Sequence, residues 1–498
     1  MEIQNERMPD RNKWPINIEE KPFKNHQPLV VEAGSKVEVP AQAIIPRTDF
    51  KNMLQALPAD GTGRRRVCFV TLGCKVNQYE TEAMRELFLA DGYVEASPHQ
   101  VSDIYVVNTC TVTNVAAKKS RQMLARGKKK NPACVVIAVG CYVQREHQKL
   151  KEMMGVDILI GNHRKKDILT ILDEFYQSRE IIDVVEEGYN KPSYEDLKIT
   201  RRHDKTRATI KIQDGCNQFC SYCIIPFARG KVRSRRPGMV IEEISGLVQQ
   251  GYQEFVITGI HLTSYGIDFS EKVSLIDLLE EIDKVPGVKR LRLGSLEPRL
   301  ITEEFAKRIS RLKSICPHFH LSLQSGSNGV LSRMNRRYCT QDFARGVELL
   351  RQVFAHPAIT TDVIVGFPGE TEEEFAESLN FVKNINFADL HVFKYSKREG
   401  TKAAQMQGQV AETVKNERSA KMIAIGEGCK QNYRQHFIEK EAEVLLEESV
   451  EINGQRHMIG HTREYIKVYW PTDQDQSSQD KILTLKEIYL DGMTAEKN

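Results

Sequence analysis

Apolar runs alternate with helical patterns along most of this 498-residue chain, and this alternation constrains its fold more than any other feature. Strands that alternate with helices form parallel sheets with helices on their faces. The alternation starts at Arg66, so we expect an α/β protein. A first series of strands and helices predicts an N-terminal parallel-sheet α/β domain over 66–185. One of its helices should begin at Asn77, because Asn77 followed by Glu80 fits a capping box.

A second series of alternating elements predicts a central domain over 202–430. Six βα-type units are too few for a full eight-stranded barrel, which takes about 250 residues. We therefore expect an open, partial (β/α)6 barrel that a helix over 412–439 closes. The six candidate strands are 208–213, 254–259, 289–295, 319–324, 359–367 and 389–395.

The two ends of the chain do not show this alternation of strands and helices. Residues 431–495 alternate apolar and polar positions with period two, which predicts a small C-terminal antiparallel β domain. Residues 1–65 contain seven of the 18 prolines and no long periodic pattern. We expect an N-terminal extension there, partly extended or disordered.

The compartment can be inferred from the apolar runs and the first residues. The longest apolar run, Ala133 to Val143, is too short to span a membrane, and the first residues are polar and charged. We therefore expect a cytoplasmic protein with no membrane contact. The cytosol keeps thiols reduced, so grouped members of the 11 cysteines indicate a metal site or catalysis rather than disulfides.

Three cysteines form a C-x3-C-x2-C triplet, GCNQFCSYC, directly after the first strand of the second series. They are Cys216, Cys220 and Cys223. In barrels the ends of the strands carry the active site. Three thiolates can hold three irons of a 4Fe-4S cluster and leave the fourth iron open for a small molecule. A zinc knuckle is the competing interpretation, although zinc sites usually have four ligands with C-x2-C pairs.

A second set of cysteines is dispersed. Cys74, Cys110 and Cys141 each follow a predicted strand of the first domain. The carboxyl ends of parallel strands meet at one edge of a sheet, so the three thiols can converge there. A cysteine at a strand end is also often a small core residue, and the residues alone leave both interpretations open.

Basic residues gather in two blocks. Residues 118–130 hold seven Lys and Arg and no acid, and residues 201–236 hold ten against two acids. Blocks of this kind suit a phosphate backbone, although a solvated helix face has the same composition. The segment 431–498 is acidic, with eight basic and thirteen acidic residues.

The motifs around both cysteine sets resemble those of a known family. GCNQFCSYCIIPFARGKVRSRRP is similar to the radical S-adenosylmethionine (SAM) signature of the methylthiotransferases. TLGCKVNQYET, NTCTVT and GCYVQR resemble the three cysteine motifs of that family's N-terminal domain. The order of domains also agrees, with the C-terminal β domain corresponding to the family's TRAM domain. GCKVNQ resembles the subgroup that acts on threonylcarbamoyladenosine in tRNA, whereas relatives acting on isopentenyladenosine tend to read GCQMN.

The resemblance implies two 4Fe-4S clusters and SAM. Cys216, Cys220 and Cys223 would ligate the cluster that binds SAM, and Cys74, Cys110 and Cys141 an auxiliary cluster that carries the sulfur. The residues expected around SAM are Thr258, Gly259, His261, Ser295, Glu297, Ser322, Gln324, Arg336, Asp362 and Gly366.

The implied reaction adds a methylthio group to C2 of the modified adenosine at position 37, in the anticodon loop. The residues expected to contact RNA are Arg229, Lys231, Arg233, Arg235, Arg236, Arg463 and Lys467. The resemblance further implies a monomer and an electron donor such as flavodoxin or ferredoxin. Three alternatives stay open: an isopentenyladenosine tRNA acceptor, a ribosomal-protein aspartate acceptor, and a non-catalytic metal-containing protein that binds RNA.

Overall fold

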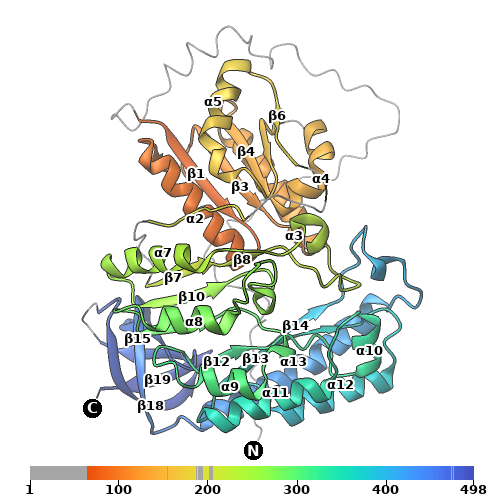
Figure 1. Cartoon of the computed structure of the whole chain (residues 1–498), viewed down its shortest axis with the longest axis vertical. Coiled ribbons are helices and arrows are strands. Elements are labelled where there is room, and N and C mark those ends of the chain that lie inside the picture. Colours follow the sequence, from red (N-terminus) through yellow and green to blue (C-terminus); the bar gives the residue numbers. More distant parts are fainter. Residues whose placement is uncertain are drawn as a thin grey trace, which may run out of the picture. The chain divides into compact units, whose positions relative to one another are not determined.

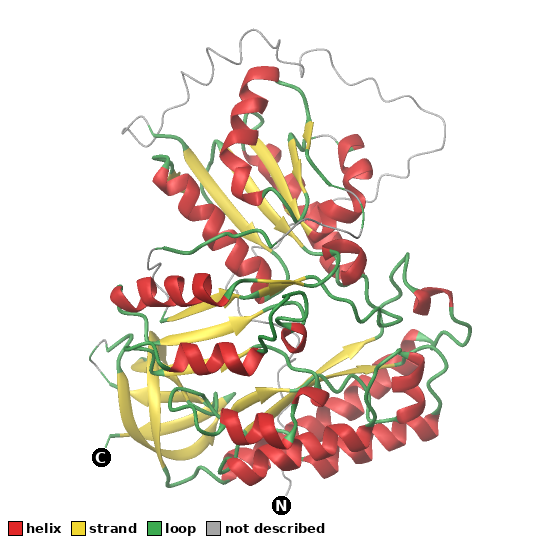
Figure 2. Ribbon diagram, viewed as in Figure 1, coloured by secondary structure: helices red, strands yellow, loops and turns green. Residues whose placement is uncertain are grey.

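The computed structural model describes residues 64–497, except 154, 187, 189–193, 201–205, 473 and 475. The predicted extension over 1–65 therefore lies outside the described residues, apart from Arg64 and Arg65. Figure 1 labels the elements along the chain, and Figure 2 separates helices from strands. No helix in the described part is long and apolar enough to cross a membrane.

The first group of elements is a six-stranded sheet in the order β2-β1-β3-β4-β5-β6, in which every neighbouring pair is parallel. This confirms the predicted parallel sheet. The strands are β1 (Arg66–Thr71), β2 (Val94–Glu95), β3 (Ile104–Thr109), β4 (Val135–Gly140), β5 (Ile158–Ile160) and β6 (Ile182–Asp183).

Alternate strand residues point to opposite faces of this sheet, and their apolar side chains are buried on both. Helices therefore cover both faces. Met84 and Phe88 pack with Phe175 on one face, and Leu124 packs with Val143 on the other. The helices are α2 (Lys75–Ala90), α3 (Asn114–Lys130), α4 (Cys141–Glu152), the short 3-10 helix η2 (Lys165–Asp167) and α5 (Ile168–Ser178). Met84 and Phe88 belong to α2 and Phe175 to α5, so these two helices share a face. Leu124 belongs to α3 and Val143 to α4, which share the other face.

The start of α2 differs from the prediction. The helix begins at Lys75 with Cys74 at its N-cap, so the capping box predicted for Asn77 and Glu80 is wrong. Both side chains are buried inside the helix instead. Asn77 donates from Nδ2 to the carbonyl oxygens of Leu72 and Thr109, which ties the helix to the neighbouring strand ends.

The second group confirms the six predicted strands of a partial barrel. β7, β10 and β11 form one parallel sheet, and β12, β13 and β14 form another. Parallel bridges from Leu291 to Ile315 and from Leu296 to Leu321 connect the two. The strands are β7 (Arg207–Lys211), β10 (Glu254–Thr258), β11 (Arg290–Leu293), β12 (His318–His320), β13 (Ala358–Val365) and β14 (Asp389–Lys394).

Helices pack on the outside of these strands and share one large apolar core with them. The longer helices are α7 (Pro237–Gln249), α8 (Leu275–Asp283), α9 (Glu303–Ile309), α11 (Thr340–Val353), α12 (Glu372–Ile385) and α13 (Glu412–Gln435). The short elements are β8 (Gln213–Asp214), α6 (Ile225–Arg229), β9 (Arg233–Ser234), η3 (Leu262–Ser264), η4 (Pro298–Leu300), α10 (Asn328–Arg333) and η5 (Lys402–Gln405). Since the strands are parallel, the loops after them lie at one end of the barrel.

The last group is a small closed β-barrel in the order β15-β16-β17-β19-β18. Its pairs are antiparallel as predicted, except that β17 and β19 run parallel. The strands are β15 (Glu441–Ile452), β16 (Gln455–Thr462), β17 (Lys467–Pro471), β18 (Asp480–Tyr489) and β19 (Gly492–Glu496). Helix α13 passes the proposed domain boundary at 430, and the domain limits themselves stay predictions.

Candidate active site

The loop with the cysteine triplet follows β8 at the open end of the partial barrel. Gly215 has φ +73°, and a Cβ there would lie 1.9 Å from the carbonyl oxygen of Lys231, so only glycine fits this turn. The turn places Cys216, Cys220 and Cys223 around one pocket. Burial raises the pKa of the Cys216 thiol to about 11 and that of Cys223 to about 12. Such thiols stay protonated unless a metal takes the place of the proton.

The pocket beside the triplet has a volume of about 160 Å³. Arg336 reaches into it and donates from Nη1 to Sγ of Cys220 at 3.2 Å. His261 lies with Nε2 2.9 Å from a carboxylate oxygen of Glu297. Six of the ten residues predicted around SAM line this pocket: His261, Ser295, Glu297, Ser322, Gln324 and Arg336.

Hydrogen bonds from neighbouring residues fix the side chains of Glu297 and Gln324 in the pocket. Burial would raise the pKa of the Glu297 carboxyl, but the hydrogen bond and charge of His261 outweigh it and lower that pKa. Gln324 has a left-handed backbone, with φ +66°, and accepts a hydrogen bond at Oε1 from the hydroxyl of Tyr222 at 3.0 Å. Tyr222 also lines the pocket, and sequence reasoning missed it because its neighbours Cys220 and Cys223 dominate the motif.

The other four predicted residues do not line the pocket. Thr258 is buried at the end of β10, and Gly259 packs against the side chain of Gln213. Gly366 has φ +70° and donates from its backbone nitrogen to Glu370, so its role is in the turn after β13.

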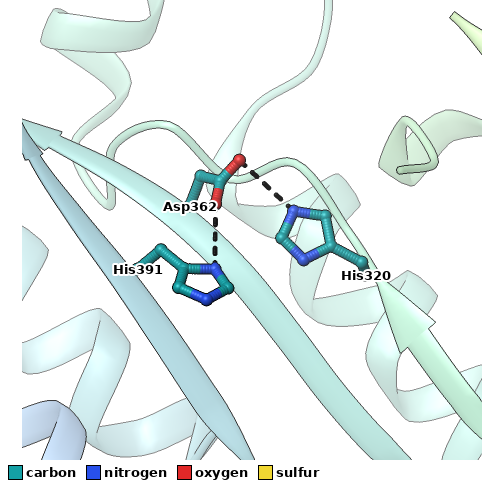
Figure 3. Close-up of side chains that lie close together, drawn as sticks. All are labelled: His320, Asp362 and His391. Atoms are coloured by element: carbon teal, nitrogen blue, oxygen red, sulfur yellow. Dashed lines mark ion pairs between the residues drawn. The ribbon is translucent and has the colours of Figure 1, made fainter. Parts of the chain in front are cut away.

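The fourth, Asp362, lies on β13 and forms a separate cluster with His320 of β12 and His391 of β14. Figure 3 shows both imidazoles turned toward its carboxylate. Each imidazole is 3.3 Å from one of the two carboxylate oxygens. Burial would raise the pKa of Asp362, but the two hydrogen bonds outweigh it and hold that pKa well below its usual range. The hydrogen bond to Asp362 in turn raises the pKa of His391. Asp362 is therefore a paired group within the barrel rather than part of the pocket wall.

The dispersed cysteines lie at the ends of three neighbouring strands, as the sheet order predicts. Cys74 follows β1, Cys110 follows β3, and Cys141 follows β4. A Cβ at Gly73 would lie only 3.0 Å from both Cβ and Sγ of Cys110. Burial, with contributions from the nearby Cys141 and Cys74, raises the pKa of Cys110 to about 11. Three thiols therefore share one edge of the sheet.

Arg229 connects the two cysteine sets. It is fully buried at the end of α6, directly after the triplet loop, and its Nε lies 3.2 Å from Sγ of Cys141. Its other nitrogens donate to Glu80, Asp214 and Asn77. One guanidinium thus joins the loop of the triplet to the edge that holds the dispersed thiols.

A buried charge network surrounds this guanidinium. Lys211 pairs with both Glu80 and Asp214 at 2.7 Å, and Lys165 pairs with Glu80 at 3.3 Å. Burial alone would raise the pKa of Glu80, but Arg229, Lys165 and Lys211 hold it well below its usual range. With Arg233, which lies 3.8 Å from Asp214, four cations thus contact two carboxylates beside Cys141, which favours an anionic ligand at the thiols. Sequence reasoning missed these residues, since no spacing relates Glu80 to Asp214.

The structure corrects several of the residues predicted to contact RNA. Arg229, Arg233 and Arg235 are buried, with at most 4% of each residue exposed, so they do not reach an external phosphate. Arg235 pairs instead with Glu243 and Asp196. The reason is physical: this basic run borders the core, and its guanidiniums neutralise acids from other segments.

The remaining predicted RNA contacts are at least partly exposed. Lys231 and Arg236 are exposed, and Arg236 pairs with Glu271 at 3.0 Å. Lys467 pairs with Asp491 at 3.2 Å. Arg463 donates to the carbonyl oxygens of Lys313 and Ile315, so it anchors the small β-barrel to the central domain.

Comparisons with known proteins agree with this geometry. Residues 210–382 match the model of the Radical SAM superfamily, and residues 66–161 match that of the Uncharacterized protein family UPF0004. The chain is 44% identical over 411 residues to threonylcarbamoyladenosine tRNA methylthiotransferase MtaB of Bacillus subtilis, covering 82% of this chain and 91% of the relative. It is 33% identical over 384 residues to tRNA-2-methylthio-N(6)-dimethylallyladenosine synthase of Pelotomaculum thermopropionicum, covering 76% and 86%.

A solved structure supports the fold. The radical S-adenosylmethionine methyltransferase TsrM of Kitasatospora setae aligns with a TM-score of 0.50 at 17% identity, covering 66% of this chain and 72% of that one. At that identity the likeness extends to the fold alone. The cysteine triplet, the partial barrel and the 44% identity to a relative covered over nine-tenths of its length lead to one conclusion. The chain belongs to the MtaB-type methylthiotransferase family of radical SAM enzymes.

Proposed function

We propose that this protein transfers a methylthio group to C2 of N6-threonylcarbamoyladenosine at position 37 of tRNA, and that it consumes two SAM molecules in doing so. The observation that carries the proposal is the contact of Arg229 with Cys141, which joins the two cysteine sets. Removal of hydrogen and supply of sulfur have to occur at one substrate carbon, so both sets must serve the same site. The higher identity to the threonylcarbamoyl enzyme than to the dimethylallyl enzyme favours the threonylcarbamoyl acceptor.

The residues present fit two 4Fe-4S clusters. Cys216, Cys220 and Cys223 would hold the first and leave one iron open for SAM. Cys74, Cys110 and Cys141 would hold the second in the same way. Glycines next to both sets give the backbone the left-handed turns that bring the thiols together, as at Gly73 and Gly215. When bound, the clusters and SAM supply the one-electron chemistry, the methyl group and the sulfur, which side chains cannot provide.

The side chains of the pocket orient and shield these groups. Glu297 presents a carboxylate that His261 holds in place, and Arg336 presents a guanidinium to the same pocket. This pair of opposite charges suits the amino and carboxylate groups of SAM. Arg336 also offsets negative charge at Cys220 through its 3.2 Å contact. Burial of the network around Arg229 keeps water away from Cys141, which is itself buried.

The remaining parts of the proposal concern partners. Lys231, Arg236 and Lys467 are at least partly exposed and, unlike Arg463, are not bound to backbone carbonyls of another domain, so we assign tRNA phosphates to them. An electron donor such as flavodoxin or ferredoxin, and a monomeric state, stay predictions.

Mass spectrometry of nucleosides from total tRNA tests the proposal. A strain without this gene should lack 2-methylthio-threonylcarbamoyladenosine, and the gene should restore it. If only the isopentenyl analogue changes, the acceptor is isopentenyladenosine. If no tRNA nucleoside changes, a protein acceptor or a non-catalytic role replaces the proposal. Iron and sulfide analysis separates these last two, because two filled clusters contain about eight irons per chain.

A further inference from the structure

A second cavity, of about 450 Å³, is lined by Lys75, the residue after Cys74, and is not used by the function described so far. Its size lies within the range of roughly 300–1,000 Å³ typical of small-molecule sites. It lies between α2, the strands β7, β10 and β11, the start of β12, and the segment before β17. The side chains that matter for its chemistry are Lys75, Arg207, Arg292, His318 and Tyr465. The wall also includes the carboxylate of Glu82, which is paired with Arg85.

Two of the three cations in this wall are neutralised. Glu254 pairs with Arg292 at 2.7 Å and with Arg207 at 3.2 Å. Arg207 also pairs with Glu447, and Arg292 donates to the carbonyl oxygens of Thr462 and Arg463. Both guanidiniums are thus fixed parts of the wall, held by carboxylates and carbonyl oxygens of other segments.

Lys75 is different. Its charged neighbours are Arg207, Arg292 and Glu254, yet among the described residues no carboxylate lies within ion-pair distance of its ammonium. It is an exposed residue that lines the cavity and directly follows Cys74. A cation beside two guanidiniums and without an acid of its own is a surplus positive charge. Such a charge favours an anionic ligand.

A second group in the same wall also lacks a partner. Nδ1 of His318 is buried and makes no hydrogen bond within the described residues. The ring lies 5.1 Å from that of Tyr465, which Arg207 fixes by donating to its hydroxyl at 2.8 Å. Buried polar atoms are normally hydrogen-bonded, so an unsatisfied nitrogen in a side chain that lines a cavity indicates a polar ligand group.

We propose that this cavity receives the threonylcarbamoyl group of the substrate, with its carboxylate on the ammonium of Lys75 and its polar atoms on Nδ1 of His318. The inference rests on the proposed function and names the residues that recognise its acceptor. The position agrees with the chemistry, since Lys75 adjoins a thiol of the proposed auxiliary cluster.

Binding of synthetic anticodon stem-loops tests the proposal. Three loops are compared: one with threonylcarbamoyladenosine, one with its carboxylate as the neutral methyl ester, and one with unmodified adenosine. We expect the native enzyme to bind the free acid at least about tenfold more tightly than the ester, because a charge-assisted hydrogen bond is lost with the ester. In Lys75→Gln the acid and the ester should bind equally.

The outcomes separate the possible anions. If Lys75→Gln weakens all three loops by the same factor, the ammonium binds a backbone phosphate and the carboxylate assignment is overturned. If the variant keeps the native preference for the acid over the ester, the cavity assignment is overturned. His318→Ala should weaken the two threonylcarbamoyl loops and leave the unmodified loop unchanged. An equal effect on all three would contradict its role.

Controls distinguish a loss of substrate recognition from a loss of folding, of clusters or of activity. Lys383→Gln removes one exposed charge from α12, outside the cavity, and should leave every affinity unchanged. Iron content and the absorption spectrum verify that Lys75→Gln retains the clusters. If the native enzyme fails to modify the threonylcarbamoyl loop at all, the proposed function fails. If it modifies that loop and Lys75→Gln does so equally well at low substrate concentration, only this inference fails.

Discussion

The two cysteine sets present the same number of thiols in opposite ways. Cys216 to Cys223 occupy one loop, where the chain itself keeps the thiols together. Cys74, Cys110 and Cys141 lie on three loops, and only the order of β1, β3 and β4 brings them to one edge. A local set can therefore be recognised from spacing, whereas a dispersed set depends on the strand order of the sheet.

Their surroundings differ as well. The local set faces a pocket with the paired side chains of His261 and Glu297 and the guanidinium of Arg336. The dispersed set borders a buried network in which Arg229 contacts Cys141. The first environment suits a small zwitterion that enters and leaves. The second suits a permanent anionic group that needs fixed compensation.

The largest expected effect comes from removing one thiol of each set. Cys220→Ala and Cys141→Ala should both abolish methylthiolation and lower iron from about eight to about four per chain. Only Cys220→Ala should also abolish reductive cleavage of SAM, because SAM binds beside the triplet. Cys339→Ser, outside both sets, is the matched control and should keep all the iron. If Cys141→Ala retains eight irons, the dispersed set is not a cluster site.

The next effect concerns the connection between the sets. Arg229→Met leaves Glu80 and Asp214 buried without their guanidinium, which should lower the free energy of unfolding by about 3–5 kcal/mol. Thermal or denaturant unfolding of the purified variant measures the change. Arg236→Met lies in the same basic run but pairs on the surface with Glu271, so it should alter stability little. Equal effects of the two variants would refute the role of Arg229.

A smaller effect is expected in the pocket of the local set. Glu297→Gln removes the carboxylate that His261 contacts and should weaken SAM binding about tenfold. Anaerobic equilibrium dialysis with labelled SAM measures the affinity, and the iron content should stay at the native value. An unchanged affinity would show that this carboxylate does not serve SAM.

The smallest effect should come from Asp362, which lies outside both sets. Its pKa is lowered, so its stabilising contribution is present above about pH 3.9 and is lost as the pH falls through the lowered pKa. The pKa of His391 is raised, so that contribution is present below about pH 6.5 and is lost as the pH rises through the raised pKa. The stability difference between native protein and Asp362→Asn should therefore be largest between about pH 4 and 6.5. Unfolding at several pH values tests this, and a difference that grows above pH 7 would contradict it.

Some site residues could be read from the sequence because their signal is local. The triplet, and the six pocket residues that follow strand ends or lie in the loops after them, stand in short motifs at predictable positions. The basic run after the triplet misled the same reasoning, since Arg229, Arg233 and Arg235 have the composition of a phosphate-binding segment. Their carboxylate partners include Glu80 and Asp196, which belong to distant parts of the chain. Charge alone therefore did not distinguish a surface patch from a buried network.

The sequence by itself determined the α/β class, the approximate strand positions and the grouping of the local cysteine triplet, because hydrophobic period and chain continuity act over short distances. Only the tertiary structure decided that the dispersed thiols share one edge, which cations are buried and which residues line the pocket. It also decided that, among the described residues, no carboxylate lies within ion-pair distance of Lys75. These properties depend on which segments meet in space. The free energy of a charge is set by those neighbours and by burial, neither of which is encoded in local spacing.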